Sequence, residues 1–182
     1  HALLDIYLIK NKIIDNIIVS DVHPSALNAG IENIKKYKLE NKIDTRLGDG
    51  LKALKEKDVV DTILISGMGT NTIIQILQNQ DLNQLSSFVI QTNNDYYLLR
   101  KFMTSIGYQI EEEITFYDKG IRYIAIKFIK GIQNYSYFEL LLGPKLMQKK
   151  DKETIIKKLS DIFNVPETAV RIRIEELELD NE

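Results

Sequence analysis

The sequence predicts an α/β protein with a Rossmann-like sheet that is mostly parallel and ends in a C-terminal antiparallel hairpin. Between residues 16 and 107, short apolar runs alternate with segments of helical spacing, and the runs end in acidic or glycine-containing turns. Strands that alternate with helices form βαβ units, whose strands are parallel. Two longer strand runs follow, at residues 108–117 and 121–130, joined across Asp118-Lys119-Gly120. A short connection that contains glycine is typical of a hairpin, so these last two strands are predicted to be antiparallel.

The individual elements follow from the spacing of apolar residues. The first helix carries Leu3, Leu4, Tyr7 and Leu8 at helical spacing, which predicts a single apolar face. Strands are predicted at residues 16–20, 43–47, 62–65, 88–91, 108–117 and 121–130. Helices are predicted at residues 2–13, 24–37, 51–57, 70–77 and 99–106, and again after residue 145.

A break at Leu142-Gly143-Pro144 predicts two parts, a main domain at residues 1–142 and a C-terminal extension at residues 143–182. The extension begins with a lysine-rich helical segment that Val165-Pro166 is expected to end. Residues 170–179 (VRIRIEELEL) then alternate apolar and charged side chains. This alternation predicts a half-exposed or edge strand, since a central strand would be apolar on both faces.

Composition excludes several classes of function. The chain of 182 residues has no cysteine, so a disulfide scaffold, a thiol nucleophile and a cysteine-ligated zinc site are excluded. Its only histidines are His1 and His23, and no metal site is expected. No apolar run approaches the ~18 residues that a membrane span requires. We therefore expect a soluble, cytoplasmic protein, most simply a monomer, that binds neither metal nor membrane.

Because the net charge is -2, nucleic-acid binding would depend on local basic patches. Two lysine clusters are candidates for phosphate contacts, and a solvated helix face is the alternative explanation for each. The clusters are Lys35, Lys36 and Lys38, and Lys145, Lys149, Lys150 and Lys152. Three acidic residues in a predicted strand are expected to be mostly solvated: Glu111, Glu112 and Glu113.

Three groups at the ends of successive predicted strands are candidates for a ligand site. Asp21 could accept hydrogen bonds from both hydroxyls of a ribose, or it could simply cap a helix. Asp49 lies in Gly48-Asp49-Gly50, where the side chain or the neighbouring amides could reach an adenine amino group, although such a sequence is also common in turns. Gly67-Met68-Gly69 follows Ser66 and would let a ligand approach the main chain. Their order at one edge of a parallel sheet favours a nucleoside cofactor.

Several segments together resemble the bacterial tRNA adenine-N1 methyltransferases that modify adenine 22 of tRNA. The segments are HALLDIYLI, SDVHPSALNAGIENI, IDTRLGDGL, ILISGMGTNTIIQIL, VIQTNNDYYLLRKFM and LLGPKLMQKK. The resemblance implies a class I fold that uses S-adenosylmethionine, and tRNA as the partner. It implies that Asp21, with Val22, holds the ribose and that Asp49 and Gly50 flank the adenine. Ser66, Gly67, Met68 and Gly69 would line the methyl-donor pocket, and His1 would belong to the loop around the methionine end of the cofactor.

The chain departs from the family pattern in three places. The pattern begins with a central strand and a loop of the type DIGSDHA, of which His1 and Ala2 match only the final two residues. We therefore expect residues 1–182 by themselves to bind the cofactor weakly or not at all. Thr92 stands where the family usually has proline, and the tail is predicted to be strand-like, whereas the family tends to end in a helical hairpin that contacts tRNA.

The implied reaction needs chiefly positioning, because adenine N1 already carries a lone pair and the methyl group is activated. Asn93 is the candidate catalytic residue, placed to hydrogen-bond the edge of a flipped base, and Tyr96 or Tyr97 could stack on that base or pack within their helix. Three alternatives stay open: a methyltransferase of a small molecule or protein, a nicotinamide-dependent enzyme, and an RNA-binding module without catalysis.

Overall fold

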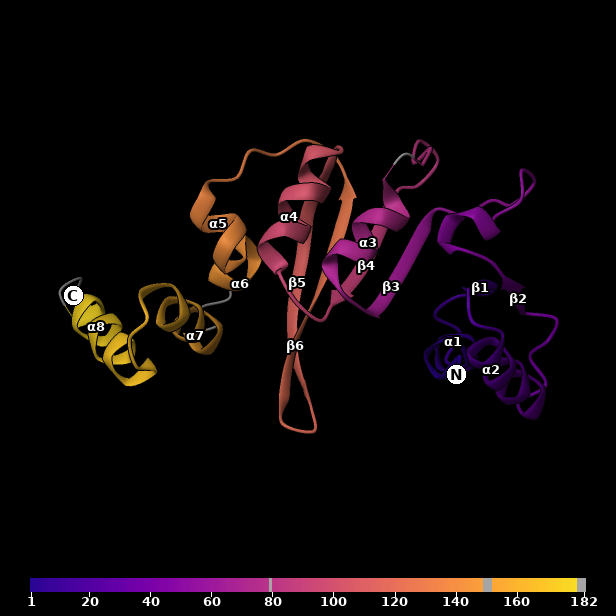
Figure 1. Ribbon diagram of the computed structural model, residues 1–182, viewed down its shortest axis with the longest axis horizontal. Helices are drawn as coiled ribbons and strands as arrows, with labels where there is room; N and C mark the ends of the chain where they lie inside the picture. Colours follow the sequence, from indigo (N-terminus) through magenta and orange to yellow (C-terminus); the bar gives the residue numbers. More distant parts are fainter. Residues whose placement is uncertain (79, 149–151, 180–182) are drawn as a thin grey trace. The chain divides into compact units, whose positions relative to one another are not determined.

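The computed structural model describes residues 1–78, 80–148 and 152–179 (Figure 1). The chain forms two compact units, each with its own sheet. The first unit contains His1–Val59 and Ile76–Gln80, and the second contains Val60–Gln75 and Asp81–Glu182. Together the two sheets contain parallel and antiparallel strands in the predicted order, so the α/β class with a C-terminal antiparallel hairpin is confirmed.

The first unit is built on two parallel strands, as the alternating pattern predicts. They are β1 (Ile17–Asp21) and β2 (Ile43–Leu47), with Ile17 opposite Ile43 and Asp21 opposite Leu47. Helix α2 (Pro24–Lys36) connects them and has its proline in the first turn, where no amide partner is lost. The remaining elements are α1 (Leu3–Lys10) and the 3-10 helix η1 (Gly50–Ala53), which replaces the predicted longer helix at residues 51–57.

The core of the first unit uses a different face of α1 from the predicted one. The buried side chains of α1 are Ile6 and Ile9, which pack with Ile34 and Ile43. The prediction that Leu3, Leu4 and Tyr7 share the buried face is wrong, because all three are exposed. The helix is apolar on most of its circumference, so the spacing of apolar residues alone does not select the buried side.

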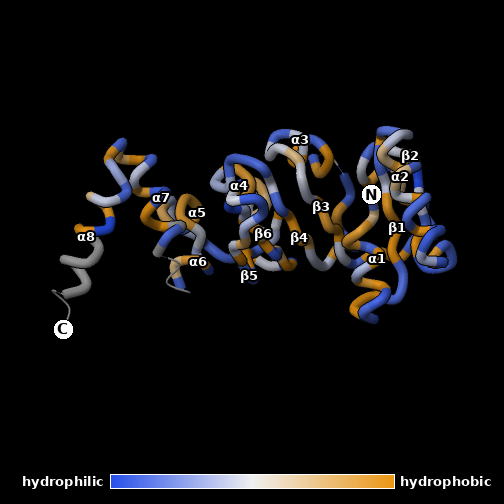
Figure 2. The backbone as a smooth tube through the Cα atoms, turned by 90° about the horizontal axis from the view of Figure 1, so that it is seen from below, coloured by the Kyte–Doolittle hydropathy of each residue, from blue (hydrophilic) through white to orange (hydrophobic). Residues whose placement is uncertain are grey.

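The second unit is a four-stranded sheet of order β3-β4-β6-β5. Its strands are β3 (Thr62–Met68), β4 (Ser87–Thr92), β5 (Tyr108–Asp118) and β6 (Ile121–Lys130). Strand β3 is parallel to β4, whereas β6 is antiparallel to both of its neighbours. Apolar residues concentrate along these strands (Figure 2). Helices α3 (Thr70–Leu77) and α4 (Tyr96–Ser105) follow β3 and β4 respectively.

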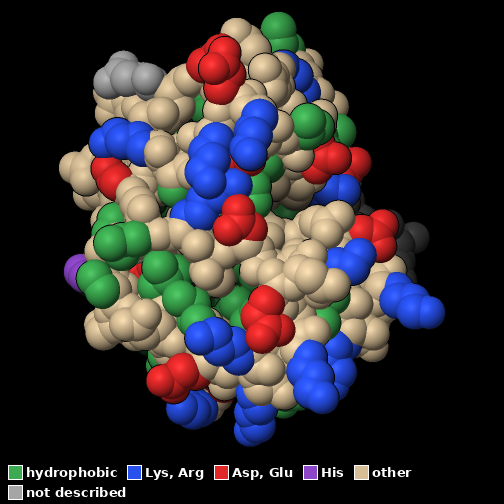
Figure 3. Space-filling view, turned by 90° about the vertical axis from the view of Figure 1, so that its right-hand side faces the viewer, with side chains coloured by type: hydrophobic (Ala, Val, Ile, Leu, Met, Phe, Trp, Pro, Cys, Tyr) green, Lys and Arg blue, Asp and Glu red, His purple; other side chains and the backbone are tan. Residues whose placement is uncertain are grey.

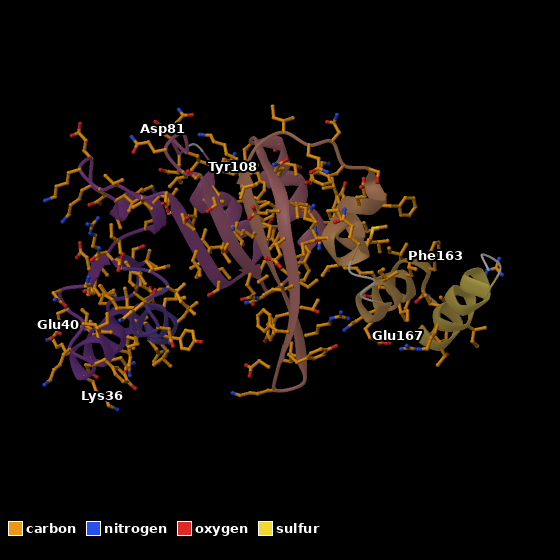
Figure 4. The ribbon with its side chains drawn as sticks, turned by 180° about the vertical axis from the view of Figure 1, so that it is seen from behind. Lys36, Glu40, Asp81, Tyr108, Phe163 and Glu167 are labelled. Atoms are coloured by element: carbon orange, nitrogen blue, oxygen red, sulfur yellow. The ribbon has the colours of Figure 1, made fainter. Side chains whose placement is uncertain are left out.

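Buried aromatic and aliphatic residues hold α4 on this sheet. Phe88 and Tyr108 are packed edge to face, with ring centroids 4.9 Å apart. The Tyr108 hydroxyl donates to the carbonyl of Leu85 at 2.9 Å, so its polar end is satisfied inside the core. Leu99 and Met103 of α4 are fully buried. Figure 4 labels Tyr108 at the beginning of β5.

Residues 143–182, predicted as a C-terminal extension, contain helices and no strand in their described part, which corrects one prediction. These residues form α6 (Pro144–Gln148), α7 (Lys152–Phe163) and α8 (Glu167–Leu179), and α5 (Tyr137–Leu142) directly precedes them. The break at Gly143 lies between α5 and α6 as predicted. Residues 170–179 belong to a helix, so the strand-like tail is wrong. The Pro166 carbonyl accepts the first helical hydrogen bond of α8, from Ala169 at 2.9 Å, and glutamate, leucine and arginine are good helix formers.

A buried ion pair joins the sheet, α4 and the break between α5 and α6. Arg100 Nε donates to Glu113 Oε1 at 2.7 Å, and both side chains are 0% exposed. Arg100 also donates to the Leu140 carbonyl at the end of α5, and Glu113 Oε2 accepts from the Lys145 amide at the beginning of α6. The expectation that Glu113 is solvated is therefore wrong, while Glu111 and Glu112 are exposed as expected.

These charges match the two helix ends, since a cation is favoured at a helix C-terminus and an anion at an N-terminus. Burial lowers the pKa of Arg100 from its usual value, and the adjacent Glu113 carboxylate opposes that shift. Gly143 lies against the pair: a Cβ there would be 2.8 Å from Arg100 Nη2 and 2.9 Å from Glu113 Oε2. The pair thus explains why the break requires glycine.

Removal of one partner of this pair is expected to destabilise the second unit. Arg100→Met would leave the Glu113 carboxylate buried without its counter-ion, and such changes cost about 3–5 kcal/mol. The free energy of unfolding in urea measures the loss. Lys127→Met is the matched control, because it breaks the exposed pair in which Lys127 Nζ lies 2.6 Å from Glu111 Oε2. Similar losses in both variants would contradict a special role for the buried pair.

Candidate functional site

The acidic group of the candidate site lies at the carboxyl ends of β1 and β2. Because Asp21 is opposite Leu47 in a parallel pair, the loops that follow both strands meet at one edge. The Gly48 amide donates to the Asp21 carbonyl at 3.0 Å. Asp21 Oδ1 accepts a hydrogen bond from the His23 amide at 2.8 Å. This bond orients the carboxylate and leaves its second oxygen, Oδ2, for a ligand such as a ribose hydroxyl.

The Gly48-Asp49-Gly50 turn follows β2 at the same edge. Asp49 Oδ2 forms an exposed ion pair with Lys52 Nζ at 2.7 Å. Gly50 has a φ of 55°, and a Cβ at this position would lie 2.6 Å from Ile76 Cγ2. Its carbonyl accepts from the Ser20 hydroxyl at 3.4 Å. Glycine is therefore required at residue 50 both by conformation and by packing.

A charged cluster that the sequence analysis missed fixes the loop after this turn. Arg46, on β2, donates to the carboxylates of Asp44 and Asp58. The Arg46 guanidinium holds the pKa of Asp58 below its usual value, and the amide of Lys55 acts in the same direction. Asp44 and Arg46, two residues apart and therefore on one face of the strand, are the signal in the sequence that could have identified this cluster.

Val22 lies beside the acidic group, whereas His1, the other predicted residue of the first unit, does not. Val22 is exposed and directly follows Asp21 at the strand end. The His1 carbonyl accepts from Asn33 Nδ2 at 2.9 Å, on α2. Asn33 lies about 13 Å along that helix from Pro24, at 1.5 Å per residue. The structure brings together Asp21, Val22, Asp49 and Gly50, whereas the main chain of His1 lies farther along α2.

The glycine group lies at the carboxyl end of β3, in the second unit. The sequence predicts that the strand stops at Ile65, but pairing with β4 continues to Met68 after a register shift. Gly67, inside this irregular segment, has a φ of 76°, and apart from Gly67 and its two chain neighbours no residue has an atom within 4 Å of the position of an added Cβ. Ser66 and Met68 are exposed on either side. The main chain at Gly67 is therefore open to a ligand, as the glycine pattern predicts.

Two side-chain amides from the end of β4 bind this segment, and we call the arrangement the amide clamp: Gln91, Asn93 and the main chain of Gly67. The Gly67 amide donates to Gln91 Oε1 at 2.8 Å, and Asn93 Nδ2 donates to the Gly67 carbonyl at 2.9 Å. Gln91 Nε2 donates to Asn93 Oδ1 at 3.2 Å, which closes the ring of hydrogen bonds. Each primary amide has two donors and two acceptor lone pairs, so Asn93 keeps one of each for a ligand.

A buried pair of threonines, Thr70 and Thr92, fixes the loop after β4 that carries Asn93 of the amide clamp. Thr92 Oγ1 lies 2.8 Å from Thr70 Oγ1, and the Thr70 hydroxyl donates to the Asn94 carbonyl at 2.6 Å. The Thr70 amide donates to Asn94 Oδ1 at 2.9 Å. Neither threonine side chain is exposed. At Thr92, hydrogen bonds from a side chain hold the loop where the family pattern has a proline ring.

Both candidate stacking residues make contacts within the protein. The Ile124 amide donates to the Tyr96 hydroxyl at 3.2 Å, and burial raises the pKa of Tyr96 above its usual value. The Tyr97 ring is packed edge to face against Tyr137, with centroids 5.4 Å apart. Stacking of either ring on a substrate base stays a prediction.

The surface charges are mixed. Lys35, Lys36 and Lys38 are exposed, but Lys149 and Lys150 lie outside the described residues. Figure 3 shows basic and acidic side chains interspersed over the face that it displays. Over the part of the chain that the structure describes, no group of acidic and histidine residues is arranged to hold a metal ion. In the same part, no helix is both long and apolar enough to cross a membrane.

Comparison with known proteins gives the class. The family profile described as tRNA (adenine(22)-N(1))-methyltransferase matches residues 1–181. The Mycoplasma genitalium protein named "Putative tRNA methyltransferase MG248" is 30% identical over 168 residues, 91% of this chain and 75% of that protein. The tRNA (adenine(22)-N(1))-methyltransferase of Bacillus subtilis is 25% identical over 159 residues, which are 83% of this chain and 66% of that protein.

Solved structures agree. Streptococcus pneumoniae Sp1610 in complex with S-adenosyl-L-methionine is 28% identical, with a TM-score of 0.81, over 89% of this chain and 79% of that chain. TrmK of M. capricolum in complex with S-adenosyl-homocysteine is 26% identical, with a TM-score of 0.72, over 98% of this chain and 85% of that chain. The fold is that of the Rossmann-like methyltransferases. The chain belongs to the tRNA (adenine(22)-N(1))-methyltransferase family, whose enzymes use S-adenosylmethionine.

The hydrogen bond between Thr70 and Thr92 is expected to contribute to the stability of the second unit. Thr70→Val and Thr92→Val are each expected to lower the free energy of unfolding by about 1–3 kcal/mol, because each leaves buried polar atoms unsatisfied. The double variant should lose less than the sum of the two, since the second change removes a hydroxyl whose partner is already gone. Thr168→Val, on the exposed side of α8, is the control. Additive losses would show that the two hydroxyls act independently.

Proposed function

We propose that this protein transfers a methyl group from S-adenosylmethionine to N1 of adenine 22 of tRNA. The observation that carries this proposal is the amide clamp, which presents the Asn93 amide at the strand edge where ligands of open α/β sheets bind. We further propose that the protein works as a cytoplasmic monomer. The α7–α8 pair supports tRNA as the partner, since the resemblance implies that a helical hairpin at this position contacts tRNA.

The residues present fit the cofactor. Asp21 has an oriented carboxylate oxygen for the ribose, and the Gly48-Asp49-Gly50 turn beside it would flank the adenine. The open main chain at Gly67 suits close approach of the methyl donor. The bound cofactor supplies a methyl group on a positively charged sulfur, with a neutral thioether as leaving group.

Asn93 would orient the acceptor base. Its Oδ1 can accept a hydrogen bond from the adenine 6-amino group, which turns the adjacent N1 lone pair toward the donor. When the N1–methyl bond forms and the sulfur–methyl bond breaks, the positive charge moves from sulfur to the adenine ring. The 6-amino group then loses a proton to solvent. No strong base is needed for attack, so orientation is the main contribution of the protein.

Substitution of Asp21 and Asn93 should separate cofactor binding from methyl transfer. In the full-length protein, Asp21→Ala is expected to raise KM for S-adenosylmethionine with little change in kcat. Asn93→Ala is expected to lower kcat by about tenfold to hundredfold, the effect of one lost hydrogen bond to the reacting base. Transfer of a radiolabelled methyl group to a tRNA transcript measures both.

The controls are Asp15→Ala and Gln84→Ala, which change an exposed aspartate and an exposed side-chain amide. A transcript with guanine in place of adenine 22 should accept no methyl group from the unaltered protein. Unchanged kcat in Asn93→Ala would remove Asn93 from the mechanism, and methylation of the guanine transcript would contradict adenine 22 as the target.

A further inference from the structure

The β5–β6 hairpin continues beyond the rest of its sheet. The first residue of β6 that pairs with β4 is Ala125, opposite Gln91 of the amide clamp. Beyond that pair, residues 121–124 of β6 pair only with residues 115–118 of β5. Four residues of strand extend about 13 Å. We call residues 114–124 the hairpin arm, which is visible as the two-stranded projection below the sheet in Figure 1.

The hairpin arm extends from the edge that holds the candidate site. Strand β4 runs toward Asn93, and β6 is antiparallel to it, so the residues before Ala125 lie past the carboxyl end of β4. The hydrogen bond between Tyr96, in the first turn of α4, and the Ile124 amide ties the base of the arm to the helix that follows the clamp. A substrate base held by Asn93 would therefore have the arm as a neighbour.

Aromatic side chains occupy both faces of the hairpin arm. On one face, Phe116 and Tyr123 are directly opposite and stacked, with ring centroids 5.6 Å apart and an angle of 24° between the planes. On the other face, Tyr117 is 65% exposed and lies 5.9 Å from the guanidinium of Arg122. Side chains project to both sides of the hairpin in Figure 4. The basic residues Lys119 and Arg122 outnumber Asp118, the single acid of the arm.

Exposed aromatic rings with adjacent cationic side chains are suited to binding unpaired nucleotides. Unpaired bases stack on aromatic side chains, and arginine adds attraction to both the ring and the phosphate. A base that reacts at N1 must be unpaired, because N1 lies on the edge used for base pairing, and it must leave its stack to reach an active site. The nucleotides on either side of that base then expose their own faces, at the edge from which the hairpin arm projects.

We propose that the hairpin arm is a stacking platform for the unpaired tRNA nucleotides that flank the target adenine, with Phe116 and Tyr117 as its contact residues. The proposal rests on the proposed function for its substrate. It adds a specificity surface that is separate from the cofactor residues and from the α7–α8 helices. A second copy of the chain is the other conceivable occupant of the apolar face with Phe116, and the test distinguishes it.

Affinity for tRNA without cofactor tests the platform. In the intact gene product, Tyr117→Ala and Phe116→Leu are expected to raise Kd for the unmodified transcript by roughly 5- to 100-fold, the effect of one lost base stack. Tyr117→Phe should retain affinity, because the ring is kept. Ile132→Ala changes a residue that is 91% exposed just after β6 and serves as the control. A transcript with 2-aminopurine beside adenine 22 should show quenched fluorescence on binding that Tyr117→Ala reduces.

The measurement of tRNA affinity tests the hairpin arm separately from the measurement of methyl transfer, which tests the proposed function. Loss of tRNA affinity with unchanged Kd for S-adenosylmethionine and unchanged thermal unfolding supports the hairpin arm even if no methyl transfer is found. Unchanged tRNA affinity in both variants overturns it. An equal loss in Tyr117→Phe, or a dimer that Phe116→Leu dissociates, overturns it as well, since the aromatic face would then have a structural or self-association role.

Discussion

The hydrogen bond from the Gly67 amide to Gln91 Oε1 is the interaction on which the candidate site depends. Gly67 has a positive φ inside a segment that pairs irregularly with β4, so the strand end would otherwise expose unpaired amides and carbonyls. Gln91 and Asn93 satisfy the donor and the acceptor of the same residue. In consequence the position of the Asn93 amide, and of any base that it binds, follows from how β3 ends.

Two sets of buried polar contacts fix the helices and loops around the amide clamp. The threonine pair joins the beginning of α3 to the loop after β4. The Arg100–Glu113 pair joins α4 and β5 to the break between α5 and α6. An unpaired buried charge is costly, so this pair favours one arrangement of α5 and α6 relative to the sheet. The second unit therefore combines an open, glycine-lined edge with a tightly specified interior.

Most of the fold could be predicted from the sequence, and the errors have physical causes. The hairpin at residues 108–130 was clear because its strands are long and its turn contains glycine. Residues 170–179 were predicted to form a strand because their apolar residues fit the two-residue period of a strand as well as the period of a helix. The high helix propensity of these residues favours the helix that the structure shows. Glu113 and Gln91 could not be assigned, since their partners, Arg100 and Gly67, come from other elements and only the tertiary structure brings them together. Asp21, Asp49 and Gly67 were identifiable because each lies at or close to the carboxyl end of a strand.

The central claim is that the clamped Asn93 amide recognises the 6-amino group of the target adenine. The most direct measurement compares methyl-transfer rates of the unaltered protein and Asn93→Ala on transcripts with adenine or purine at nucleotide 22, since purine lacks that amino group. If Asn93 contacts the amino group, purine should slow the unaltered protein about as much as Asn93→Ala does, and should slow the variant little further. Full additivity of the two losses would show that Asn93 does not contact the amino group and would contradict the account.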